Sequence, residues 1–184
     1  MKSVMLIVSM IALLQIKAPA QNVARGPVMA HYLQLVSAEF VVDVYHNGTL
    51  VPFHLHQLQK EVFGAQIEKV LLEIHEGDWL VFHVVNNGLR DGFPRSFFAA
   101  GMIDETHAAF VTDPKTHRWY ACDEIQKVPH FITDRADKGD GNVQALTHPW
   151  KDGDKWIHEK VPGWKGAPIW GTSHSSWLKY IVVR

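Results

Sequence analysis

The chain has 184 residues, of which 47% are hydrophobic and 20% charged, a composition that suits one globular domain and excludes a disordered chain. Its formal net charge is −1, so it has no basic excess to support charge-driven binding to nucleic acid. The single cysteine, Cys122, excludes an intrachain disulfide, and we expect it to be a small buried apolar residue.

The first twenty residues have the pattern of a secretory signal peptide. Lys2 precedes an apolar run from Val4 to Leu14, and Ala18-Pro19-Ala20 supplies the small residues of a cleavage site. The run has about eleven residues, fewer than the roughly twenty that span a bilayer, which argues against a membrane anchor. We predict a signal peptide over residues 1–20, a flexible lead-in over 21–30, and a secreted or periplasmic mature chain with no membrane span.

Residues 40–53 predict a β-hairpin. In the first strand Phe40, Val42 and Val44 alternate with Val41, Asp43 and Tyr45. Asn47-Gly48 follows, and this dipeptide is a strong signal for a two-residue hairpin turn because both residues tolerate a positive φ. We expect the second strand to run from Thr49 to Phe53.

Residues 67–85 predict a second pair of strands around a turn at residues 75–78. The second of these strands is rich in the β-branched and aromatic residues that suit a pleated surface. One face carries Trp79, Val81, His83 and Val85, and the other carries Leu80, Phe82 and Val84. Because both faces are largely apolar, we expect a central strand buried on both sides, with His83 as a core histidine rather than a catalytic base.

Further short strands are expected over residues 96–103, 108–112 and 118–122, with a closing strand over 176–183. Residues 123–142 hold the one helix-like stretch, which Pro129 limits to a turn or two. Short strands separated by turns, without long helices between them, predict an all-β sandwich or barrel. We expect one domain over residues 31–184.

A long polar segment interrupts this pattern between Ala136 and Ser176. It is rich in glycine and proline, and it is longer than an ordinary connection inside a compact domain. Its aromatic content argues against disorder. We predict a long loop insertion over residues 136–176 that lies across the sandwich or lines one end of it.

The order of "FVVDVYHNGTLV", "IEKVLLEIHEGDWLVFHVVNNG" and "SFFAAGMI" resembles the galactose-binding-like jelly rolls found beside catalytic domains in secreted glycoside hydrolases. The matching residues lie within about 39–103 and are Tyr45, Asn47-Gly48, Gly77-Asp78 and Val84-Val85-Asn86. The resemblance implies a β-sandwich of jelly-roll type. Such modules serve sugar binding, protein contacts or scaffolding, so the resemblance leaves these functions open.

The twelve histidines raise the question of a metal site. His54 and His56 would share one face of a strand, and His46 across the hairpin, or His83, could add a third imidazole. Neither a His-Glu-x-x-His pair nor a cysteine–histidine zinc spacing occurs, and many histidines stand beside turn residues. We therefore expect no metal and no cofactor, with His46, His54 and His56 as the weak candidates.

Other chemistries have less support. Ser173-His174-Ser175-Ser176 holds hydroxyls and an imidazole side by side, but adjacent residues rarely face each other, which favours a loop entering the last strand. Carboxylates for glycoside hydrolysis stand at or beside turns, where acids are common: Asp78, Asp104, Glu105, Asp123 and Glu124. Two acidic turns suggest calcium, through Asp152-Gly153-Asp154 or through Asp137, Asp140 and Asn142, although Lys138 would oppose a cation there.

Tryptophans in the long segment are the strongest candidates for ligand binding. Sugar sites favour flat aromatic rings beside polar groups. Asp154 and His158 stand near the four tryptophans, which are Trp150, Trp156, Trp164 and Trp170; the alternative is that these rings pack the loop onto the core. We therefore predict a secreted, non-catalytic module that binds carbohydrate or an extracellular protein. The alternatives are a structural or assembly subunit, and a metal-dependent or hydrolytic enzyme using the histidine-rich face.

Overall fold

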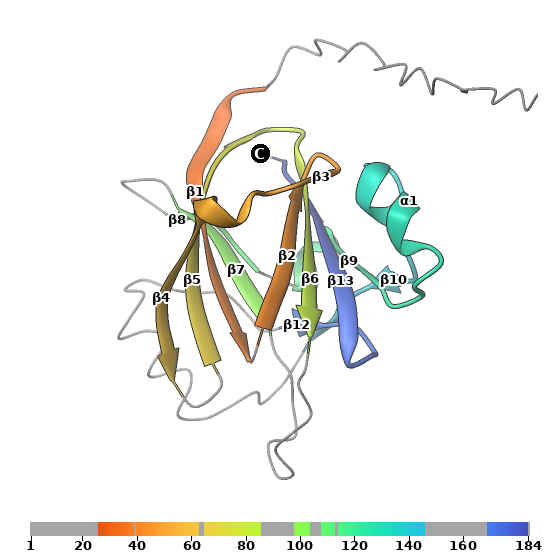
Figure 1. Ribbon diagram of the computed structural model, residues 1–184. Coiled ribbons are helices and arrows are strands. Elements are labelled where there is room, and N and C mark those ends of the chain that lie inside the picture. The colour runs from red at the N-terminus through yellow and green to blue at the C-terminus, as the bar shows by residue number, and fades with distance from the viewer. Residues whose placement is uncertain are drawn as a thin grey trace, which may run out of the picture.

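In the computed structural model the chain folds as two antiparallel β-sheets with one short α-helix (Figure 1). The structure describes residues 26–38, 40–62, 65–85, 98–103, 108–112, 114–145 and 169–183. The signal peptide expected over residues 1–20 lies outside this part of the chain. No described helix has the length and apolar character that crossing a membrane requires.

The first sheet, sheet A, contains the long strands from the first half of the chain. Its order is β11 (Gln144–Ala145), β12 (Ile169–Trp170), β7 (Phe98–Ile103), β1 (Val28–Ala38), β5 (Ala65–His75) and β4 (His56–Val62), with β8 (Ala108–Val111) also paired to β7. The second sheet, sheet B, has the order β10 (Gly141–Asn142), β9 (Trp119–Cys122), β13 (Ser175–Ile181), β6 (Trp79–Val85), β2 (Phe40–His46) and β3 (Thr49–Leu50). The helical turns are η1 (Phe53–Leu55), η2 (Pro114–Thr116) and α1 (Val128–Thr133).

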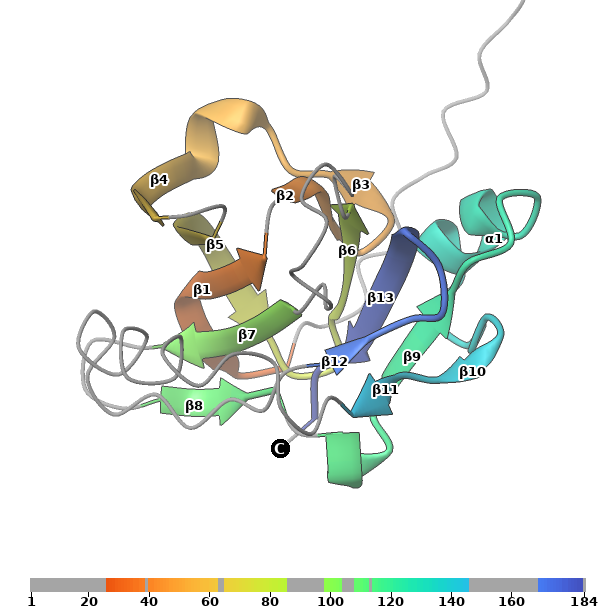
Figure 2. The same ribbon diagram turned by 90° about the horizontal axis from the view of Figure 1, so that it is seen from below.

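The chain passes repeatedly from one sheet to the other. β1 lies in sheet A, β2 and β3 in sheet B, β4 and β5 in sheet A, and β6 in sheet B. The same alternation continues to β13, and Figure 2 shows the passage from β10 at the edge of sheet B into β11 at the edge of sheet A. The predicted all-β sandwich is therefore confirmed at the level of two facing antiparallel sheets.

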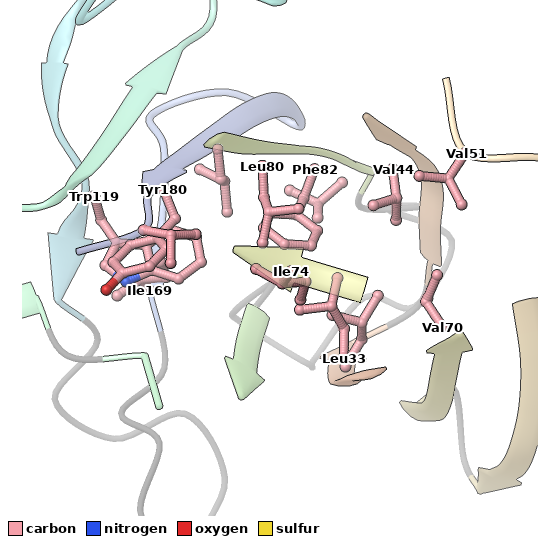
Figure 3. Close-up of a cluster of buried hydrophobic side chains, with 14 of the residues drawn as sticks. Leu33, Val44, Val51, Val70, Ile74, Leu80, Phe82, Trp119, Ile169 and Tyr180 are labelled. Carbon is pink, nitrogen blue, oxygen red and sulfur yellow. The ribbon is translucent and has the colours of Figure 1, made fainter. Parts of the chain in front are cut away.

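Apolar side chains between the sheets form the main core, and Figure 3 shows how they meet. Leu33, Val70 and Ile74 come from sheet A, whereas Leu80 and Phe82 come from sheet B. All five are at most 1% exposed. Burying such side chains contributes about 1.5–3 kcal/mol each, so this interface between the sheets is the main source of stability.

The Asn47-Gly48 hairpin is confirmed, with φ values of 51° and 79° at its two turn residues. The prediction that the second strand runs to Phe53 is wrong, because β3 ends at Leu50 and residues 53–55 form η1. Pro52 stands between them and has no N–H to continue the ladder.

The predicted alternation in β2 is interrupted by a β-bulge between Val41 and Asp43. Val44 is fully buried and Val41 packs against the core, whereas Val42 is 51% exposed. A bulge inserts one residue and shifts which side chains face inward. Asp43 is then directly opposite His83 of β6.

The strands predicted as a pair over residues 67–85 are consecutive but not paired. β5 belongs to sheet A and β6 to sheet B, and the turn at Glu76-Gly77 carries the chain between them. Both strands direct apolar side chains into the same core, among them Ile74 and Leu80. The two strands therefore face each other across the sandwich and contribute to the core from opposite sheets.

β6 is a central strand, but the prediction of burial on both faces holds fully for only one of them. Leu80, Phe82 and Val84 on the inner face are buried, whereas His83 on the outer face is half-buried and is not the core histidine that was expected.

The outer face of β6 also carries Val81, which packs with Cys122, Phe131 and Trp177 in a second cluster under α1. Cys122 is fully buried, which confirms its expected role, and burial raises the pKa of its thiol to about 11. Pro129 at the first turn of α1 is consistent with a helix of only six residues.

Candidate functional site

The segment predicted as one long loop over residues 136–176 contains structure at both of its ends. β10, β11, β12 and the start of β13 lie within it. β11 pairs with β12, through Gln144 with Trp170 and Ala145 with Ile169, and Ile169 also pairs with Phe98 of β7. The connection over residues 146–168 therefore begins and ends at neighbouring positions on the edge of sheet A.

Trp170 differs from the other candidate tryptophans because its place is described. Its side chain belongs to the core, with 6% exposure, and its indole N–H donates to the carbonyl oxygen of Ser173 at 2.7 Å. For Trp170 the alternative interpretation is therefore correct: its ring packs the segment onto the sandwich. The remaining candidate residues lie outside the described part of the chain: Trp150, Asp154, Trp156, His158 and Trp164.

The three candidate metal histidines occupy different places. His54 and His56 do not share a strand face, because His54 lies in η1 and His56 begins β4. His56 contacts the Glu68 carboxylate through Nδ1, and His46 Nε2 donates to Asp78 Oδ2 at 2.7 Å. Within the described ranges, no three metal-ligating side chains form a group that could hold an ion.

Asp78 holds two turns together. It accepts hydrogen bonds from His46, from Asn47 Nδ2 at 2.7 Å and from the His75 amide at 2.8 Å. Burial alone would raise the pKa of this carboxyl, but the three donors outweigh burial and lower the pKa to about 2. Asn47 Oδ1 also accepts from the Trp79 amide at 3.0 Å, so the network joins the hairpin turn to the start of β6.

The acidic turn considered for calcium lies beside a buried lysine, and the carboxylates of Asp137 and Asp140 have side-chain partners of their own. Lys179 of β13 is fully buried, and its Nζ donates to the carbonyl oxygens of Asp134 and Asp137, both at 2.8 Å. Asp137 Oδ2 contacts His130 Nδ1 at 2.7 Å, and Asp140 accepts from Lys127 and from the Asp123 amide. Burial lowers the pKa of Lys179 to about 8, opposed by the nearby Asp137 and Asp134.

Gly139 is required in this turn, and Gly139→Ala is expected to destabilise the protein. Its φ is +56°, and an added Cβ would lie 2.5 Å from the Ala121 carbonyl oxygen and 2.8 Å from the Phe131 ring. Gly77→Ala is the matched control, because Gly77 also has a positive φ but no atom within 4 Å of the added Cβ. We expect the Gly139 variant to lose about 1–3 kcal/mol more than the control in urea unfolding, because the clash adds to the backbone strain. Equal losses would contradict this.

The carboxylates considered for glycoside hydrolysis are not assembled as a pair among the described residues. Asp123 Oδ2 accepts from the Thr172 amide at 2.6 Å, and Glu124 is bonded to Lys127 at 2.7 Å. Asp78 belongs to the network between turns described above. Asp104 and Glu105 lie outside the described residues.

Four side chains on the outer face of sheet B form a polar and aromatic group, named here the outer-face cluster: Asp43, His83, Ser175 and Trp177. His83 Nε2 lies 2.8 Å from Ser175 Oγ, and His83 Nδ1 lies 3.5 Å from Asp43 Oδ2. The imidazole stacks on the Trp177 ring, with centroids 4.1 Å apart and planes 5° from parallel. Three neighbouring strands, β2, β6 and β13, therefore bring an acid, a base and a hydroxyl together.

Strand pairing explains the geometry of the outer-face cluster. Asp43 and Trp177 are each opposite His83, and Ser175 lies two residues before Trp177 and so on the same face of β13. Burial lowers the pKa of His83, although Asp43 has the opposite effect. The lowered pKa favours the neutral imidazole at neutral pH.

Ser175 and His83 can each be noticed in the sequence, but no sequence pattern indicates that they contact each other. They are 92 positions apart, and only the β6–β13 register brings them together. The serine run before the closing strand and the histidine inside an apolar strand were the available signals. The β-bulge that sets Asp43 opposite His83 has no mark in the sequence.

No family model, no curated protein and no solved structure matches this chain.

Proposed function

We propose that this protein is a secreted binding module for carbohydrate, built on a β-sandwich of the galactose-binding-like jelly-roll type. The two antiparallel sheets are consistent with that fold type, and the signal-peptide pattern supports secretion. The mature chain would carry 16 basic and 19 acidic residues after loss of Lys2 and Lys17, which favours a neutral ligand over a polyanion.

The pairing of β11 with β12 carries the proposal. It brings the two ends of the connection over residues 146–168 to the same point on the edge of sheet A. Segments whose ends are held close together on a sheet are frequent binding loops. This one contains Trp150, Trp156 and Trp164, together with Asp154 and His158.

Those residue types match the chemistry of a sugar. The flat apolar face of a pyranose stacks on an indole ring, and carboxylate or imidazole groups take its hydroxyls. Trp170 contributes differently, as the buried anchor of β12, because its ring is in the core and its indole N–H is bonded to Ser173. We therefore assign ligand contact to the three tryptophans between β11 and β12.

The test is a glycan array followed by titration calorimetry on the best ligand. We expect Trp156→Ala to weaken binding by about 10-fold or more, since loss of one stacked ring costs about 1–3 kcal/mol. Phe53→Ala is the matched control, because Phe53 is 89% exposed and lies in η1, outside the loop. That variant should bind as the wild type does.

The proposal fails if the protein binds no glycan, or if the Trp156 and Phe53 variants bind equally well. Concentration-dependent assembly in the absence of glycan affinity would instead support a structural subunit. Destabilisation of Trp156→Ala in urea unfolding, with unchanged glycan affinity, would show that this ring packs the loop rather than binding sugar.

A further inference from the structure

We infer that the outer-face cluster is a hydrolytic site for carboxylic esters, with Ser175 as nucleophile, His83 as general base and Asp43 as the residue that positions the imidazole. This activity goes beyond carbohydrate binding and does not depend on it, because none of the three residues lies between β11 and β12.

The contact between Ser175 and His83 is the first step of the inference. A serine hydroxyl becomes nucleophilic when a base within hydrogen-bond reach takes its proton as it attacks. The 2.8 Å separation between Ser175 Oγ and His83 Nε2 meets that requirement. The sequence separation of 92 residues means that the pairing of β6 with β13 creates this contact.

Asp43 supplies the third part of the arrangement. Nε2 can accept the serine proton only when the neutral imidazole carries its hydrogen on Nδ1, and a carboxylate beside Nδ1 favours that tautomer. Asp43 Oδ2 lies 3.5 Å from Nδ1, which is ion-pair distance and longer than a hydrogen bond. When the imidazole gains a proton during reaction, its attraction to this carboxylate increases.

Trp177 restricts the imidazole in a second direction. The centroids of the two rings lie 4.1 Å apart and the rings are nearly parallel. Turning the imidazole out of this parallel orientation would therefore break the stacking contact. Trp177 is 9% exposed and belongs to the cluster under α1, which makes it a rigid support. β2 and β13 therefore hold the base from two sides, and β13 also presents the nucleophile.

The reacting groups remain accessible to solvent. The side chains of His83 and Asp43 are 17% and 34% exposed, and Ser175 is partly exposed. The cluster lies where β6 approaches its last residue and β13 begins, at one end of sheet B. The three reacting side chains therefore each keep some contact with solvent on the outer face of sheet B.

The proposed reaction has two balanced steps. Ser175 Oγ attacks the ester carbonyl carbon, His83 takes the hydroxyl proton, and the alcohol leaves with that proton, which gives an acyl-serine. Water then attacks the acyl carbon while His83 takes one of its protons. The carboxylic acid leaves, and the proton returns from His83 to Ser175 Oγ.

Covalent labelling of the full-length mature protein tests the nucleophile. A fluorophosphonate probe should react at Ser175 Oγ with loss of fluoride, and peptide mass spectrometry should locate the adduct there. Ser175→Ala should abolish labelling, and His83→Gln should slow it about 100-fold or more, since general-base catalysis contributes typically 10²–10⁴-fold. Ser173→Ala is the matched control, because Ser173 is an exposed serine two residues away and should leave labelling unchanged.

Hydrolysis of p-nitrophenyl acetate tests turnover and the role of Asp43. Asp43→Asn should lower kcat by about 10-fold or more with little change in KM, because it affects the protonated imidazole rather than substrate binding. Thermal unfolding should match the wild type for each variant that is compared. The inference is overturned if Ser175 takes no label, or if Ser175→Ala and Ser173→Ala hydrolyse the ester at the wild-type rate.

Discussion

Lys179→Met is expected to lower the free energy of unfolding by about 2–4 kcal/mol, because it removes the ammonium that donates to two carbonyl oxygens. Those oxygens belong to Asp134 and Asp137, and each accepts from Lys179 Nζ at 2.8 Å. Of the two, only the Asp134 oxygen keeps another donor among the described residues, the Asp137 amide at 3.3 Å. Methionine has a similar length and can keep the apolar packing against Phe131, over whose ring the ammonium lies at 4.0 Å. The loss of the buried ammonium would therefore be the main change, measurable by urea unfolding at pH 7.

Lys127→Met is the control for this prediction. Lys127 makes two ion pairs, with Glu124 at 2.7 Å and Asp140 at 2.9 Å, but its side chain is 48% exposed. Exposed pairs contribute little to stability because water and salt screen them. If the two lysine variants unfold at the same urea concentration, the buried ammonium does not hold the turn after α1.

The pKa of Lys179 also predicts a pH effect. A folded-state pKa of about 8 lies below the ordinary value of 10.5, so between these values the unfolded chain binds more protons than the native one. Stability from this group therefore rises with pH through that window. The buried Cys122 thiol, whose pKa is raised to about 11 from 9.0, has the opposite effect as pH rises above 9. The pH dependence of the free energy of unfolding is therefore best measured in a Cys122→Ala background. There, Lys179→Met should abolish the increase in stability between about pH 8 and 10.5.

Asp78→Asn is expected to cost about 2 kcal/mol at pH 7, because a pKa lowered to about 2 from 3.8 represents that much stabilisation of the native state. The asparagine amide has the size of the carboxyl, but its NH₂ group cannot accept a hydrogen bond. At least one of the three donors around Asp78 would therefore lose its acceptor. A depressed carboxyl pKa contributes stability that is present above about pH 4 and is lost as pH falls toward 2. The difference in the free energy of unfolding between wild type and variant should therefore be smaller at pH 2 than at pH 7, as measured by urea unfolding.

Glu73→Gln is the control for the acid titration. Glu73 contacts His75 at 2.8 Å, but its side chain is 56% exposed, against 7% for Asp78. We expect its replacement to change stability little at either pH. A gap for Asp78→Asn that stays constant from pH 7 to pH 2 would mean that the charge of Asp78 does not stabilise the two turns.

Local patterns predicted the elements well where one physical preference dominates. The Asn47-Gly48 turn follows from the tolerance of both residues for positive φ, and Pro129 marks the first turn of α1, where its missing N–H costs no hydrogen bond. The apolar residues of β6 predict a central strand, and its inner face is fully buried. In each case neighbouring residues determine the result, so no distant contact is needed.

Patterns were less informative where a distant residue decides. The oxygens of Asp137, Asp140 and Asn142 suggested a calcium site, but the turn is held by lysines from elsewhere in the chain. Lys127 binds the Asp140 carboxylate, and Lys179 donates to the carbonyl oxygens of Asp134 and Asp137. Consecutive strands often pair, which is why β5 and β6 were expected to form a pair, but β5 pairs with β1 and β4 in sheet A and β6 pairs with β2 and β13 in sheet B.

The strand-rich composition, the hairpin, the short helix and the buried character of Cys122 follow from local propensity and apolar periodicity, which can be seen in the chain itself. Which strands share a sheet, and that Asp43, His83 and Ser175 meet on the outer face of sheet B, depends on contacts between distant segments. Register in an antiparallel sheet is set by all the strands packing together, and a one-residue bulge in β2 is enough to change which side chains face His83.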